Sequence, residues 1–182
     1  MNVQKLNIDG LMVFEPRVFT DERGAFFESF NEAAFREATS FSGAFVQDNH
    51  SISHKGVLRG LHYQLRPHAQ GKLVRVVAGA AFDVAVDIRR GSPTFGKWSA
   101  VKLTAENRKQ FWIPAGFAHG FLALEDGTEF LYKTTDFWHA ESERSVRWDD
   151  PTIGLQWPMD GRPVVSTKDA KAPLLSDAKV FD

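Results

Sequence analysis

Residues 56–89 read G-V-L-R-G-L-H-Y-Q-L-R-P-H-A-Q-G-K-L-V-R-V-V-A-G-A-A-F-D-V-A-V-D-I-R, and they contain β-rich runs that are separated by glycines. Side chains two positions apart share a face of a strand. By this rule Arg59 and His62 fall on opposite faces, unless a bulge near Gly60 turns one of them. We expect His62 and Lys72 on adjacent strands, with their side chains pointing into the mouth of a β-barrel. This arrangement would place a base beside a cation.

The composition is that of an ordinary soluble globular protein, with 43% hydrophobic and 25% charged residues among 182. The net charge of -1 supplies no global basic field, so we expect neither a nucleic-acid nor a membrane partner. The absence of cysteine excludes disulfides and thiolate metal sites. Because no signal-peptide pattern and no apolar run of membrane-spanning length occurs, we expect a cytoplasmic protein.

The rest of the chain consists of short strand-like runs between turns, which predicts an all-β sandwich or barrel. We expect one domain spanning residues 1–182, in which residues from about 150 onward form a C-terminal tail on the barrel. A helix is predicted at residues 31–38, with Asn31 as its cap, and a loop at residues 17–24. Strands are predicted at residues 11–14, 25–30, 45–53, 97–104, 111–113, 118–124 and 129–137.

Several motifs resemble one family. PAGFAH at residues 114–119 matches P-x-G-x-x-H, the core of the second cupin motif, and it sits at a predicted strand–turn–strand. Together with GVLRGLHYQ (56–64), FTDERG (19–24), QDNHS (47–51), Tyr132 and STKD (166–169), it makes the chain resemble the dTDP-4-dehydrorhamnose 3,5-epimerases over residues 17–169. The resemblance implies a jelly-roll (cupin-like) β-barrel with short peripheral helices, in homodimers that exchange N-terminal strands.

The first cupin motif differs from that of metal-binding cupins. Those proteins carry H-x-H and a downstream glutamate there, whereas this chain has His62-Tyr63-Gln64 and no matching glutamate. A tight transition-metal site is therefore poorly supplied with ligands. We expect no metal and no cofactor, as in the epimerases that the chain resembles.

The implied reaction converts dTDP-4-dehydro-6-deoxy-D-glucose to dTDP-4-dehydro-L-rhamnose by inverting C3 and C5. Removal of either proton gives an enolate, so the site needs a base, a cation near the enolate oxygen and an acid on the other ring face. His62 is the expected base because imidazole titrates near neutral pH; a structural histidine is the alternative. Lys72 matches the family's cation and Tyr132 its acid. Their alternatives are a lysine whose stem packs at a strand start and a buried, hydrogen-bonded tyrosine.

A base also needs a partner that orients it. Asp169 in STKD matches the carboxylate of the family's His–Asp pair. Asp83, which alternation directs inward, is a second candidate, and the sequence leaves both open.

The nucleotide half of such a substrate needs donors for the diphosphate and a platform for the base. Arg23 and Arg59 suit the diphosphate because guanidinium groups pair with phosphate through two parallel bonds. The resemblance places His119 nearby. For each candidate the alternative is a solvated charge or a core aromatic. The remaining substrate-binding candidates are Phe19 and Trp138 around the thymine, Gln47, Asp48 and Asn49, Glu28 from the partner subunit, and, as weaker matches, Glu143 and Lys168.

Rival functions come from two classes. One is a mono-epimerase or ketoisomerase that acts on a related dTDP-4-keto sugar, and placement of the acid relative to C3 and C5 would separate it. The other is a non-catalytic sugar-binding cupin or a metal-dependent cupin oxygenase. The missing metal ligands speak against the oxygenase, and the set of His62, Lys72, Tyr132 and Asp169 speaks against binding alone.

Overall fold

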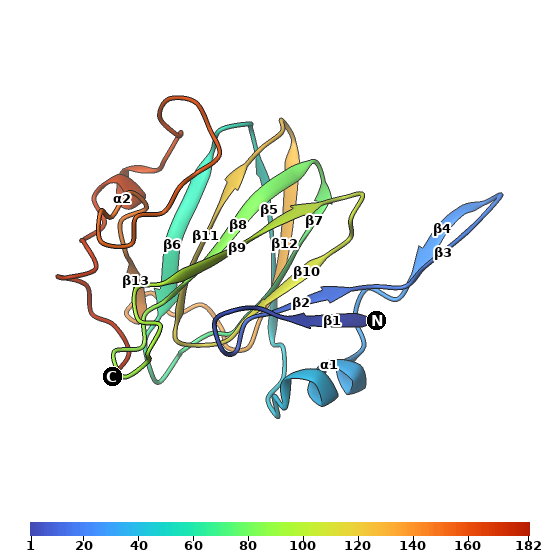
Figure 1. The fold of residues 1–182 in the computed structure, drawn as a ribbon, viewed down its shortest axis with the longest axis horizontal. Helices are drawn as coiled ribbons and strands as arrows, with labels where there is room; N and C mark the ends of the chain where they lie inside the picture. The colour runs from blue at the N-terminus through green and yellow to red at the C-terminus, as the bar shows by residue number, and fades with distance from the viewer.

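The computed structural model describes residues 1–182 and contains two antiparallel sheets that face each other, a separate hairpin and two short helices (Figure 1). The first sheet has six strands, in spatial order β1 (Asn2–Lys5), β2 (Met12–Glu15), β10 (Gln110–Ile113), β7 (Lys72–Ala78), β12 (Thr128–Thr134) and β5 (Gln47–Ser53). The second has five, β13 (Glu143–Ser145), β6 (Leu58–Gln64), β11 (Phe117–Ala123), β8 (Ala80–Asp87) and β9 (Trp98–Thr104). The predicted all-β jelly roll is confirmed.

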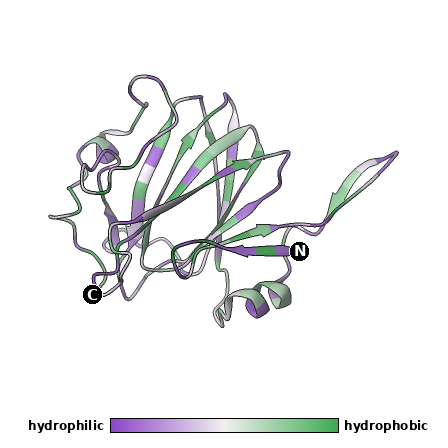
Figure 2. Cartoon of the chain, viewed as in Figure 1, coloured by the Kyte–Doolittle hydropathy of each residue, from purple (hydrophilic) through white to green (hydrophobic).

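The main core lies between the two sheets, where their inward side chains meet. Phe121 of β11 and Phe130 of β12 stack across the gap, with ring centroids 4.1 Å apart. Val74, Leu103 and Phe111 around them are fully buried. Hydrophobic and hydrophilic residues are interspersed along the strands in Figure 2, as expected where alternate side chains point to opposite faces.

A bulge in β6 decides where its side chains point. β11 pairs His119 with His62 and Phe121 with Arg59, so β6 holds one residue more than β11 between the two pairs. Gly60 lies in this interval with φ +142°, and a Cβ there would come within 2.6 Å of the β11 backbone. Only glycine fits such a position. The bulge near Gly60 that would bring Arg59 and His62 to one face is therefore present, and both residues line one cavity.

His62 and Lys72 lie on strands that follow each other in the chain but are not neighbours in a sheet. β6 belongs to the five-stranded sheet and β7 to the six-stranded sheet. The expectation of adjacent strands was wrong, because the connection 65–71 crosses from one sheet to the other. The base and the cation consequently approach from opposite walls.

The N-terminal third departs from the predicted loop at residues 17–24. This segment supplies β3 (Val18–Asp21) and the turn of a hairpin whose second strand is β4 (Gly24–Phe27), and the hairpin projects away from the sheets in Figure 1. Most residues of the hairpin are exposed, so the sequence shows no buried face from which β3 could be predicted. The strand predicted at residues 25–30 ends at Phe27. The predicted helix is present as α1 (Glu32–Thr39), and the Asn31 side chain accepts a bond from the Ala34 amide.

The C-terminal residues run irregularly over the outer face of the five-stranded sheet and include one short helix, α2 (Thr167–Ala170) (Figure 1). Leu175, Ala178 and Phe181 are buried there in a cluster with Val84 and Val86 of β8. Neither helix of the structure has the length and apolarity needed to cross a membrane.

Candidate active site

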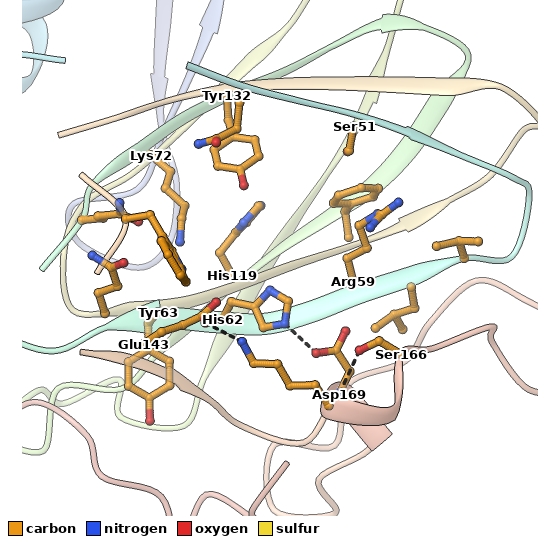
Figure 3. A pocket seen from close by; sticks show the side chains of 18 of the residues that line it. Ser51, Arg59, His62, Tyr63, Lys72, His119, Tyr132, Glu143, Ser166 and Asp169 are labelled. Carbon is orange, nitrogen blue, oxygen red and sulfur yellow. Dashed lines mark hydrogen bonds and ion pairs between the residues drawn. The ribbon is translucent and has the colours of Figure 1, made fainter. Parts of the chain in front are cut away.

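A cavity of about 610 Å³ opens between the two sheets, and most of the candidate site residues line it (Figure 3). β5, β7 and β12 contribute from one wall, and β6, β11 and β13 from the other, while α2 borders it. The candidates that line it are Gln47, Asn49, Arg59, His62, Lys72, His119, Tyr132, Trp138, Glu143, Lys168 and Asp169.

Three candidates lie outside this cavity because they belong to the hairpin or follow it. Phe19 is 52% exposed on β3. Arg23, in the hairpin turn, pairs with Asp21 at 2.5 Å, and both side chains are exposed. Glu28 accepts a hydrogen bond from Asn31 at 3.2 Å. A single chain does not bring these residues to the cavity.

Asp48 also lies outside the cavity, for a different reason. It sits on β5 between Gln47 and Asn49, whose side chains line the cavity, and alternation along the strand turns it the other way. Its carboxylate pairs instead with Lys133 at 3.0 Å.

His62 and Asp169 form a close pair. His62 Nε2 lies 2.6 Å from Asp169 Oδ1, and the Asp169 carboxylate is almost fully buried. Ser166 caps α2 by accepting from the Asp169 amide, and the Gly60 amide donates to Asp169 Oδ2 at 3.4 Å. Burial raises the pKa of Asp169, but the hydrogen bond and charge of His62 outweigh it and hold that pKa below its ordinary value.

Asp83, the other carboxylate considered for His62, pairs with His119 instead. Its Oδ2 lies 2.9 Å from His119 Nε2, and its side chain is completely buried. Burial raises the pKa of Asp83, and the nearby His119 and Lys72 oppose that rise only in part. The geometry therefore favours Asp169 as the partner of His62.

Lys72 and Tyr132 enter the cavity from the six-stranded sheet, opposite His62 (Figure 3). Burial lowers the pKa of Lys72 from 10.5 to about 8, against the opposing effect of the negative charges of Glu143 and Asp83. Burial also raises the pKa of Tyr132, so its phenol keeps its proton at neutral pH. The cavity thus presents an imidazole on one wall and an amine and a protonated phenol on the other.

Two further charged groups are held in place at the cavity. Arg59 Nε donates to Ser53 Oγ at 3.1 Å, and a second guanidinium nitrogen donates to the Ile52 carbonyl at 3.3 Å. Glu143 on β13 pairs with Lys168 on α2 at 2.6 Å. Burial raises the pKa of Glu143, but the hydrogen bond and charge of Lys168 bring it below its ordinary value.

Some cavity residues were not among the candidates. The hydroxyl of Ser51 is buried without a hydrogen-bond partner, and Ser166 Oγ caps α2 beside the His62–Asp169 pair. Both lie within family motifs, QDNHS and STKD. Ser51 is two positions from Asn49 and so shares its strand face, and Ser166 precedes an acidic residue as a helix cap does, so the sequence held a signal for each. Gln64 and Gln70 also border the cavity. The structure contains no group of three or more His, Cys, Asp or Glu side chains arranged to hold a metal ion.

Comparison with known proteins gives a consistent result. A profile of the family described as dTDP-4-dehydrorhamnose 3,5-epimerase matches residues 5–177. A dTDP-4-dehydrorhamnose 3,5-epimerase of Pseudomonas aeruginosa is 57% identical over 181 residues, which cover 100% of this chain and 99% of that protein.

Solved structures agree. The dTDP-6-deoxy-D-glucose-3,5-epimerase of Legionella pneumophila, in complex with dTDP-4-keto-L-rhamnose, matches with a TM-score of 0.93 and 52% identity over 97% of this chain and 93% of that one. A 3'-monoepimerase of Streptomyces bikiniensis, in complex with dTDP-quinovose, matches with a TM-score of 0.88 and 38% identity over 94% and 86%. The chain belongs to the dTDP-4-dehydrorhamnose 3,5-epimerase family.

Proposed function

We propose that this protein epimerises dTDP-4-dehydro-6-deoxy-D-glucose at C3 and C5 to dTDP-4-dehydro-L-rhamnose, without a metal or cofactor. The observation that carries the proposal is the paired His62 and Asp169 on one wall of a cavity whose other wall carries Lys72 and Tyr132. The extent of identity to 3,5-epimerases, 57% compared with 38% for the mono-epimerase, favours inversion at both carbons.

The chemistry assigns each residue one role. His62, oriented by Asp169, removes the proton from the carbon beside the C4 ketone, and Lys72 stabilises the enolate oxygen by its positive charge. Tyr132 donates a proton to the other ring face. An acid and a base from facing sheets suit this task, because inversion requires protonation on the face opposite to abstraction.

The nucleotide half of the substrate occupies the remainder of the cavity. Arg59 and His119 contact the diphosphate, and Gln47, Asn49 and Trp138 contact the sugar and the base. Glu143 and Lys168 line the same region and contribute as an ion pair. Arg59 suits this role because two bonds to β5 already fix its guanidinium group.

The site is completed by a second copy of the chain. In a homodimer that exchanges N-terminal strands, the projecting hairpin carries Phe19, Arg23 and Glu28 into the partner's cavity. Support comes from the exposure of the hairpin, in which Phe26 is 72% exposed, and from the position of these residues outside their own cavity. Asp48 remains a substrate contact only in such an assembly, since its side chain points away from its own cavity. The enzyme works in the cytoplasm and supplies rhamnose for lipopolysaccharide or cell-wall polysaccharide.

Incubation with dTDP-4-keto-6-deoxyglucose in deuterium oxide tests the proposal, with C3 and C5 followed by NMR. Deuterium at both carbons, together with the L-rhamno product, is expected. Inversion at one carbon only would identify a mono-epimerase, and migration of the ketone would identify a ketoisomerase. Binding without exchange would leave a non-catalytic sugar-binding protein and refute the proposal.

A further inference from the structure

The side chain of Gln64 holds the backbone on both sides of Trp138. Its Nε2 donates to the Phe137 carbonyl at 3.1 Å, and its Oε1 accepts from the His139 amide at 2.8 Å. The same Nε2 donates to the His68 carbonyl at 2.6 Å. Gln64 is only 3% exposed, so water competes little for these bonds.

Outside its backbone, Trp138 is held by one polar contact, a side-chain hydrogen bond to Glu143 that helps to lower the pKa of that carboxyl. Its side chain is 60% exposed although it lines the cavity, so core packing does not fix the indole. Its amide donates to Gln47 Oε1 at 3.0 Å. One glutamine from each sheet therefore holds this short piece of backbone, and these bonds set where the indole starts, while Glu143 bonds its far end.

The connection 65–71 and residues 136–139 also contact each other directly. The rings of His68 and His139 stack with centroids 4.0 Å apart, and Gln70 Nε2 donates to the Asp136 carbonyl at 2.7 Å. Residues 65–71 connect β6 to β7, the strands that carry the proposed base and cation. Gln64, at the end of β6, thus links the Trp138 segment directly to the strand of His62.

We propose that Gln64 is a positioning residue for the nucleotide end of the cavity, which fixes the Trp138 ring as one face of a slot for a planar nucleobase. This inference rests on the proposed function, in which Trp138 contacts the thymine. Gln64 borders the cavity, but all three of its hydrogen bonds go to protein backbone, so its amide is engaged there and acts through Trp138. Metal-binding cupins carry a histidine ligand at this position, whereas in this chain Gln64 holds a loop.

Gln64→Met tests this role, because it removes all three bonds and keeps a side chain of similar length. We expect dTDP to bind about tenfold more weakly, within the range that one base–aromatic stacking contact contributes. KM for the dTDP-sugar should rise in parallel while kcat stays close to that of the wild type. A merely structural loss would lower the melting temperature without this separation of KM from kcat.

Asn107→Leu is the matched control. Asn107 also makes three bonds to backbone, with Lys102, Thr104 and Lys109, in the turn between β9 and β10, and none of these residues lines the cavity. Its replacement should lower stability and leave dTDP affinity unchanged. If Gln64→Met does not fold, Gln64→Glu replaces it, since the carboxylate keeps an acceptor for the His139 amide and loses both donated bonds.

A double-mutant cycle with Trp138→Ala decides between action through Trp138 and any other cause. In the Trp138→Ala background, Gln64→Met should weaken dTDP binding no further. An equal loss in both backgrounds, or a folded Gln64 variant with the dTDP affinity of the wild type, would overturn the inference alone. A wild-type protein that does not bind dTDP would overturn the proposed function, and this inference with it.

Discussion

Asp169 Oδ1 lies 2.6 Å from His62 Nε2, although the two residues are 107 positions apart in the chain. β6 supplies the imidazole, while α2, within the irregular C-terminal segment, supplies the carboxylate. The segment that covers the outer face of the sheet therefore also completes the proposed catalytic pair. Contacts that anchor the C-terminus, such as buried Leu175 and Phe181, should consequently affect activity as well as stability.

Asp169→Asn tests this pair. The amide has the same size but no negative charge, so it stabilises the imidazolium less and leaves the orientation of His62 less well defined. We expect kcat to fall by about 10²- to 10⁴-fold, the range for a positioned acid–base group, with little change in dTDP affinity. Asp177→Asn, at an exposed position in the same segment, is the control and should retain full activity. An Asp169→Asn enzyme with normal kcat would remove this carboxylate from the mechanism.

The buried charge of Lys72 should lower the free energy of unfolding. Burial lowers the pKa of Lys72 from 10.5 to about 8, and this shift corresponds to roughly 3 kcal/mol of destabilisation of the charged amine at pH 7. Lys72→Met should therefore raise the free energy of unfolding at pH 7 by up to about 3 kcal/mol while abolishing epimerisation. Denaturant titration measures the first effect, and Lys102→Met, at an exposed position on β9, should change neither quantity.

The sign of the pH dependence follows from the same group. Between about pH 8 and 10.5 the unfolded chain holds the Lys72 proton while the folded chain has lost it, so this group makes stability rise with pH there. The advantage of Lys72→Met should shrink over the same window. Catalysis should change in the opposite direction, since activity that depends on the cation falls as pH rises through about 8. A stability gain that is constant with pH would contradict the assignment of the shift to Lys72.

Arg59→Ala should weaken the binding of substrate and of free dTDP together, because both carry the diphosphate. A charge-assisted hydrogen bond contributes about 1.5–3 kcal/mol, and calorimetry with dTDP measures this loss directly. Arg90→Ala, at an exposed position in the turn that follows β8, is the control. Unchanged dTDP affinity in a folded Arg59→Ala protein would remove Arg59 from the site.

The sequence was informative where a local rule settles the structure. Alternation and turn residues located most strands, and Asn31 marked the start of α1. Alternation alone could not bring Arg59 and His62 to one cavity, because that requires the extra residue at Gly60, whose presence depends on the pairing with β11. The register between strands is a tertiary property, so the sequence could state the condition but not its outcome.

Long-range contacts were beyond local rules for the same reason. Alternation directs Asp83 inward, which made it a reasonable partner for His62, but it pairs with His119 on the neighbouring strand β11. Asp169 was suggested only by the resemblance of STKD to the family motif. β3 and its pairing with β4 could not be foreseen, because the exposed residues of β3 lack the alternation that burial imposes on other strands, whereas β4 overlaps the strand predicted at residues 25–30.

The final prediction separates proton removal from proton return. Tyr132→Phe removes the phenol proton and keeps the ring, while His62, Asp169 and Lys72 remain. The base can still remove a proton and return a deuteron to the same face. The variant should therefore continue to exchange at one or both carbons in deuterium oxide, whereas formation of inverted product should fall by about 10²- to 10⁴-fold.

Tyr63→Phe is the matched control, because Tyr63 is the only other tyrosine in the chain and its hydroxyl donates to the Lys179 carbonyl at 2.5 Å, away from the cavity (Figure 3). That variant should lose about 1 kcal/mol of stability and retain inversion, since it lacks one hydrogen bond and no catalytic group. His62→Ala completes the series and should abolish exchange at both carbons. If Tyr132→Phe inverts both centres at the normal rate, Tyr132 is a core tyrosine. If His62→Ala still exchanges, another residue is the base, and the facing arrangement of β6 and β12 does not explain the reaction.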